Sequence, residues 1–195
     1  MKVQIIIGSA RKGRSTPLVA NWVKQTADKV LADKADIEIV DIVDFDLPLF
    51  DEAISPKYNQ DRQPEGDVKQ WLDTLARADG YVFVTPEYNH SIPGALKNAI
   101  DYVAHQTAQK AATIVSHGGV GGARATEHLR NIASEMGLVT TPIAVNLVGF
   151  VGMQPIINED GTLVNAESGA QGVLESALEQ LVWYTGALKT ARERN

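Results

Sequence analysis

Short runs of β-branched and other apolar residues alternate along the chain with longer stretches in which apolar residues recur every three or four positions. The short runs are typical of strands buried on both faces of a sheet, and they span Val3 to Ile7, part of Ile37 to Val43, Tyr81 to Thr85, Ala112 to Ser116 and Pro142 to Val148. The longer stretches predict helices over Thr16 to Ala32, Val68 to Ala78, Pro93 to Ala104, Gly122 to Met136 and Gln171 to Leu188.

This alternation predicts a doubly wound α/β fold with three layers. Strands that alternate with helices form a parallel sheet, and right-handed crossovers place the helices on both of its faces. With five strands, we expect the order 2-1-3-4-5. A length of 195 residues with 44% hydrophobic content suits one domain over residues 1–195. The irregular segments Asp44 to Gly66 and Gly149 to Gly161 are long, and long loops in a compact domain are usually functional or mobile.

Composition removes several classes of function. The chain has no cysteine, which excludes disulfides, thiolate metal sites and a cysteine nucleophile, so redox chemistry would need a bound cofactor. The formal net charge of -6 argues against a nucleic-acid partner. No apolar run approaches the length of a membrane span, and Val3 to Ile7 is too short for a secretion signal. We expect a soluble cytoplasmic protein without a membrane partner, and the histidines and carboxylates show no metal-ligand spacing.

The predicted strand order fixes where a ligand would bind. In an open parallel sheet the ligand lies beyond the carboxyl ends of the strands, where the strand order reverses, which here is between the first and third strands. Three loops reach that point: Gly8 to Ser15, Pro86 to Ile92 and His117 to Gly121.

The first loop has the character of a phosphate site. Between Gly8 and Pro17 it carries three cations and three hydroxyls, and no carboxylate appears before Asp28. Thr16 is the expected N-cap and Pro17 the first helical residue, so backbone N–H groups and the positive end of the helix would face a dianionic phosphate. The alternative is a solvated basic turn with ordinary helix capping.

Two other enzyme classes fit less well. The loop matches a nucleotide P-loop except that Arg14 replaces the lysine, and the third strand runs into Thr85-Pro86-Glu87 rather than a magnesium-binding aspartate. Ser9 and Ser116 follow strands but lack the G-x-S-x-G elbow of a serine hydrolase. We therefore expect both serines to act as hydrogen-bond donors, and no side chain to act as a catalytic acid, base or nucleophile.

The second and third loops suit a flat heterocycle. Tyr88 offers an aromatic face beside the rigid Pro86, and Asn89 offers hydrogen bonds, while Glu87 could equally be an ordinary loop carboxylate. Glycines 118 and 119 would let backbone N–H groups approach a planar ligand, although a flexible helix entry explains them too.

Two of these motifs resemble the NADPH-dependent FMN reductases, a family that includes quinone, azo-dye and chromate reductases. The motifs are Gly8-Ser9-Ala10-Arg11 and the segment from Pro86 to Asp101, and the resemblance extends from Met1 to about Val148. It implies a flavodoxin-like fold that holds FMN noncovalently. The implied reaction passes two electrons by hydride transfer from NADPH or NADH to a small-molecule acceptor such as a quinone, flavin, azo dye or chromate.

The resemblance also assigns the cofactor-binding residues. It implies Ser9, Arg11 and Ser15 at the phosphate, with the choice between the Ser15 and Thr16 hydroxyls open, Pro86, Glu87, Tyr88 and Asn89 along the isoalloxazine, and Ser116, Gly118 and Gly119 beside the ring. A homodimer or homotetramer is expected from the family and from the apolar stretch around Ala99 to Val103. The competing hypothesis is an FMN-binding electron carrier or redox-sensing module without nicotinamide turnover.

Overall fold

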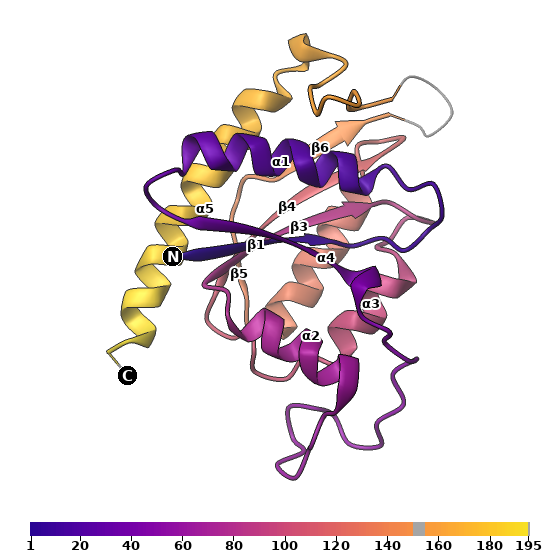
Figure 1. Cartoon of the computed structure of the whole chain (residues 1–195), viewed down its shortest axis with the longest axis vertical. Helices are drawn as coiled ribbons and strands as arrows, with labels where there is room; N and C mark the ends of the chain where they lie inside the picture. The colour runs from indigo at the N-terminus through magenta and orange to yellow at the C-terminus, as the bar shows by residue number, and fades with distance from the viewer. Residues whose placement is uncertain (150–154, 195) are drawn as a thin grey trace.

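The computed structural model describes residues 1–149 and 155–194 of the chain, and it has a parallel sheet at its centre (Figure 1). The strands are β1 (Lys2–Ile7), β2 (Asp36–Asp41), β3 (Gly80–Pro86), β4 (Ala111–Gly118), β5 (Val139–Thr140) and β6 (Val145–Val148). Their order is β2-β1-β3-β4-β5, all pairs are parallel, and β6 also pairs with β4. The flavodoxin-like α/β fold and its strand order are therefore confirmed.

Helices cover both faces of this sheet (Figure 1). They are α1 (Thr16–Val30), α2 (Gly66–Ala76), α3 (Gly94–Asp101), α4 (Ala123–Glu135) and α5 (Ala170–Arg192), with short 3₁₀ turns at Ile42–Asp44 and Ala166–Ser168. Because side chains alternate along a strand, Val3, Ile5 and Ile7 pack with α1 and α5, whereas Ile6 packs with α2, α3 and α4. Two apolar cores therefore fix the strand ends that carry the loops of the site.

The fifth strand differs from the prediction, because it is divided into two short strands. β5 begins three residues before the predicted run, and β6 occupies only its end. Between the last pair of β5 (Ala112↔Thr140) and the first pair of β6 (Val115↔Val145), β4 advances three residues and the edge chain five. Pro142 lies in this interval, and its missing N–H cannot continue the ladder. Within residues 1–149 and 155–194 the sheet thus has six strands.

The apolar stretch at the end of α3 belongs to the interior of this chain. The helix ends at Asp101, three residues before the predicted end, and Ile100, Tyr102 and Val103 are at most 7% exposed. Tyr102 packs edge-on against Phe50 from the long segment before α2. The apolar stretch is therefore part of the core of this chain and, contrary to expectation, lends no support to a dimer. Among the described helices, none has the length and apolar character needed to cross a bilayer.

Candidate cofactor site

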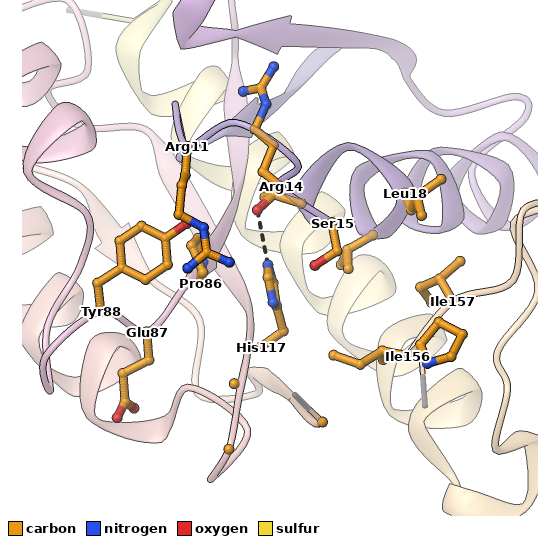
Figure 2. A pocket seen from close by; sticks show the side chains of 16 residues that line it. Arg11, Arg14, Ser15, Leu18, Pro86, Glu87, Tyr88, His117, Ile156 and Ile157 are labelled. Carbon is orange, nitrogen blue, oxygen red and sulfur yellow. Dashed lines mark hydrogen bonds between the residues drawn. The ribbon is translucent and has the colours of Figure 1, made fainter. Parts of the chain in front are cut away.

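The three predicted loops meet around one cavity of about 370 Å³ (Figure 2). Its volume lies in the usual range of small-molecule sites. Eight of the eleven predicted cofactor-binding residues line it: Arg11, Ser15, Thr16, Pro86, Glu87, Tyr88, Gly118 and Gly119. Ser9, Asn89 and Ser116 do not line it.

The phosphate loop enters α1 one residue earlier than predicted. Ser15 is the N-cap, and its carbonyl accepts from the N–H groups of Leu18 (3.0 Å) and Val19 (3.3 Å). Thr16 is the first helical residue rather than the cap, so its expected N-cap role was wrong. Within the described part of the chain, the N–H groups of Ser15 and Thr16 have no hydrogen-bond acceptor. Together with the helix dipole, they form an anion-binding end at the cavity.

The two arginines of this loop have different tasks. Arg14 makes a bidentate pair with Asp41 at the end of β2, with Nη1–Oδ1 2.7 Å, and its guanidinium points away from the cavity (Figure 2). Arg14 also donates to the Ser9 carbonyl, so it fixes the loop to the sheet. Arg11 lies over the Tyr88 ring at 5.3 Å from its centroid, on the cavity wall. Arg11 is thus the loop arginine placed to meet an anionic ligand.

A tight turn follows the cavity-lining residues of the β3 loop. Tyr88 and Ser91 exchange both backbone hydrogen bonds (2.9 and 3.0 Å), and Asn89 and His90 between them have positive φ angles of 49° and 67°. Asn89 is therefore exposed at the tip of a turn and does not reach the cavity. A turn was predicted in this segment, but its left-handed residues were not, because no glycine stands at either position.

We expect His90→Gly to stabilise the fold by about 1 kcal/mol, because a left-handed backbone is costly for any residue with a Cβ. The His90 ring is exposed, so its removal costs little packing energy. Asn89→Gly is the matched control, and its gain should be smaller because asparagine tolerates this conformation. Urea denaturation measures both. No gain, or a loss, for His90→Gly would show that the turn is not strained at His90, and equal gains would show that Asn89 is strained as much.

Glu87 joins the second loop to the third. Its carboxylate accepts from the backbone N–H of Arg124 (3.1 Å) and from Arg124 Nε (2.5 Å), at the start of α4. Burial raises the pKa of Glu87, but these hydrogen bonds outweigh it and hold the pKa below its ordinary value. The side chain is a fixed anion, which neutralises Arg124 and caps α4.

Ser116 stabilises the glycine-rich loop from inside. Its hydroxyl is fully buried, donates to the Gly121 carbonyl (2.7 Å) and accepts from Thr126 Oγ1 (2.9 Å). Gly118 and Gly119 lie on the cavity wall, as predicted from their freedom to approach a ligand. Ser116 therefore supports this wall and does not form it.

His117 lines the cavity and was not among the predicted site residues. Only 5% of it is exposed, and its Nε2 lies 3.1 Å from Thr16 Oγ1 (Figure 2). Burial, and then the nearby charge of Arg11, lowers the pKa of His117 from its ordinary 6.5 to about 4. The ring is consequently neutral near pH 7. The available signal was its position at the start of the third predicted loop, His117 to Gly121, and the structure places it opposite Pro86 at the same sheet edge.

We expect the free energy of unfolding to fall by about 2 kcal/mol between pH 7 and pH 5 because of His117. The unfolded chain binds a proton at His117 below its ordinary pKa of 6.5, whereas the folded chain binds one only near pH 4, so stability is lost as the pH falls through this window. Glu87, with its lowered pKa, loses stabilisation only below about pH 4.5. Urea denaturation at both pH values tests this. His117→Gln should flatten the dependence, and an unchanged dependence in this variant would assign it to other groups.

The wall opposite the loops is apolar. Leu18 and Val19 of α1 face Ile156 and Ile157, which come from the segment after β6. The length of that segment indicated a functional or mobile loop, but its sequence has no regular period, so its place at this cavity was not predicted. A cationic, N–H-rich end beside an apolar wall suits a ligand that has a phosphate and a flat ring.

The fold is flavodoxin-like, and the cavity lies at the topological switch point, where proteins of this fold bind their ligands. Residues 1–151 match the family described as NADPH-dependent FMN reductase. An NAD(P)H-dependent FMN reductase of Schizosaccharomyces pombe is 33% identical over 190 residues, which cover 97% of this chain and 86% of that protein. The quinone reductase of Escherichia coli K12 is 36% identical over 141 residues, covering 68% and 69%. The solved flavoenzyme NAD(P)H:(acceptor) oxidoreductase FerB of Paracoccus denitrificans has a TM-score of 0.70 at 23% identity, covering 94% and 98%.

The chain belongs to the NADPH-dependent FMN reductase family. It is therefore an oxidoreductase of the class that uses FMN with NADPH or NADH, which confirms the predicted family, enzyme class and cofactors. Family membership also decides against the electron-carrier hypothesis and against a phosphate-hydrolysing P-loop enzyme.

Proposed function

We propose that this chain is an NAD(P)H-dependent reductase that delivers two electrons to a quinone or a similar small acceptor at the cavity between its three loops. One observation carries the proposal: an anion-binding helix end, the Arg11 cation and an apolar wall converge on one cavity at the switch point. Relatives named quinone reductases in Escherichia coli and Pseudomonas putida support this choice of acceptor.

The donor set of the cavity fits FMN. Arg11, the Ser15 hydroxyl and the N–H groups of Ser15 and Thr16 offer charge and hydrogen bonds to a phosphate, and no carboxylate of the first loop opposes them. Between Pro86 and Tyr88 on one side and Gly118 and Gly119 on the other, the wall is suited to the planar ring.

The residues of this chain would bind FMN and orient it. When bound, FMN would supply the chemistry of hydride and electron transfer. Arg14 and Ser116 hold the loops in place through Asp41 and the Gly121 carbonyl. Glu87 is neutralised by Arg124, and His117 is uncharged near pH 7, so neither adds a free charge to the wall. None of the described residues in the cavity needs to act as an acid, base or nucleophile.

Steady-state kinetics with NADPH and benzoquinone, both varied, test the proposal. A reductase that uses one cavity for both substrates in turn should give parallel double-reciprocal lines, the signature of ping-pong kinetics. The control is the apoprotein assayed without added FMN, which should have no activity. Intersecting lines would require both substrates to be bound together, and an absence of NADPH oxidation with FMN bound would end the proposal.

We also propose that the protein is a cytoplasmic homodimer or homotetramer in which each chain, residues 1–195, forms one FMN-binding domain. The segment between Asp44 and α2 supports association, because Leu49, Ile54 and Tyr58 in it are 84%, 54% and 79% exposed. Light scattering at working concentration tests the assembly. A mass at or above twice 21.1 kDa is expected, and a monomer would refute it.

A further inference from the structure

Three buried polar side chains form a chain of hydrogen bonds behind the cavity. Ser9 Oγ lies 2.7 Å from Thr16 Oγ1. Thr16 Oγ1 lies 3.1 Å from His117 Nε2, the contact dashed in Figure 2. Ser9 and Thr16 are completely buried, and within the described residues neither hydroxyl has another partner. Each of the two hydroxyl protons must therefore find its acceptor inside this chain of three groups.

Only one direction of donation satisfies both protons. If Ser9 donates to Thr16, the Thr16 proton can pass to His117 Nε2, and every proton has an acceptor. In the reverse direction, Thr16 donates to Ser9 and the Ser9 proton has no acceptor. A buried hydroxyl proton without an acceptor is unfavourable, because the group has lost its hydrogen bonds to water and gained none in return. The ring nitrogen Nε2 thus accepts, and the single proton of the neutral imidazole lies on Nδ1.

The Nδ1 atom is open to the cavity. In the part of the chain that the structure describes, the buried side-chain polar atoms without a hydrogen bond are Gln4 Oε1 and Thr185 Oγ1. His117 Nδ1 has no hydrogen-bond partner in these residues either, but it is not among the inaccessible atoms. Because the ring lines the cavity, Nδ1 is accessible from there. The network therefore presents a neutral N–H donor to whatever occupies the cavity.

We propose that His117 is a further cofactor-binding residue, which donates its Nδ1–H to the phosphate of FMN from a position fixed by the Ser9–Thr16–His117 chain. The inference rests on the proposed function. The phosphate is the favoured acceptor because the His117 ring lines the same cavity as Arg11 and Ser15, and because the charge of Arg11 acts on the ring. The same arrangement turns the Thr16 hydroxyl inward, so Ser15 supplies the hydroxyl to the phosphate.

The tautomer can be observed directly by nitrogen-15 NMR of the ring nitrogens, in the apoprotein and with FMN bound. The His117 signals are those that disappear in His117→Gln. A protonated Nδ1 and an unprotonated Nε2 at pH 7 are expected in both states. The opposite tautomer, or a doubly protonated ring, would overturn the proposal. This measurement does not depend on whether FMN is the cofactor.

Two substitutions separate the two nitrogens. The amide of glutamine can take the place of Nε2 and keep the Thr16 contact, whereas that of asparagine can take the place of Nδ1 and keep the cavity donor. We expect His117→Gln to weaken FMN about tenfold and riboflavin less than twofold, because riboflavin has no phosphate. His117→Asn should retain the wild-type preference for FMN but unfold at a lower temperature.

Fluorescence quenching with FMN and with riboflavin gives these affinities. Equal losses for both ligands in His117→Gln would place the donor at the flavin ring, and no loss would leave His117 a purely structural residue; either result overturns the proposal. If the wild-type protein binds neither ligand, the proposed function itself fails, whatever the tautomer.

Discussion

Gly122→Ala should destabilise the fold by about 3 kcal/mol, since the new Cβ has no space and the backbone there is left-handed. Gly122 has φ +76°, and a Cβ would lie 2.7 Å from Ser116 Cβ and 2.9 Å from the His117 backbone nitrogen. Neither atom is the end of a flexible side chain, so the cost combines a strained backbone with overpacking. Chemical denaturation measures the loss.

Gly13→Ala is the matched control, since Gly13 has nearly the same φ of +68° but no atom within 4 Å of the added Cβ. It should lose only about 1 kcal/mol, the cost of the backbone conformation alone. Equal losses in the two variants would mean that the β4–α4 turn relaxes around the added methyl group.

Arg11→Ala is expected to weaken FMN tenfold to a hundredfold, about 1.5 to 3 kcal/mol, with a much smaller loss for riboflavin. Arg11 is on the cavity wall, whereas Arg14 is already paired with Asp41, so the loop keeps its shape when Arg11 is removed. Titration calorimetry with each ligand gives the two affinities.

Lys12→Ala is the charge-matched control for this prediction. Lys12 is exposed, does not line the cavity, and loses the same charge from the same loop. Its effect on FMN should be small and should vanish at high salt. A similar loss for Arg11→Ala and Lys12→Ala would indicate general attraction rather than a contact at the phosphate.

The order of the sheet could be predicted because its strands are buried on both faces. Under two layers of helices the run from Val3 to Ile7 is apolar at every position but Gln4, whose amide donates to the Thr74 carbonyl, and this leaves a clear pattern. The edge of the sheet is less constrained. Around Pro142 the edge chain leaves the hydrogen-bonded ladder with β4 and rejoins it with its register shifted by two residues. No local sequence pattern indicated this shift.

The cavity was located from the topology, but the tasks of its side chains depend on partners far away in sequence. Arg14 is paired with Asp41, and the Ser116 hydroxyl is hydrogen-bonded to Gly121 and Thr126. A polar residue in a ligand loop therefore need not contact the ligand. His117 shows the reverse case, because its partner Thr16 is 101 positions away in the chain.

The anaerobic visible spectrum of the FMN-loaded protein during addition of NADPH shows whether this chain holds FMN that a nicotinamide can reduce. We predict that the purified protein is yellow or becomes so with FMN, that NADPH or NADH removes the visible flavin absorbance, and that benzoquinone restores it. A protein that neither takes up colour nor quenches FMN fluorescence at micromolar concentration, or a yellow protein whose spectrum both nicotinamides leave unchanged, would contradict the account.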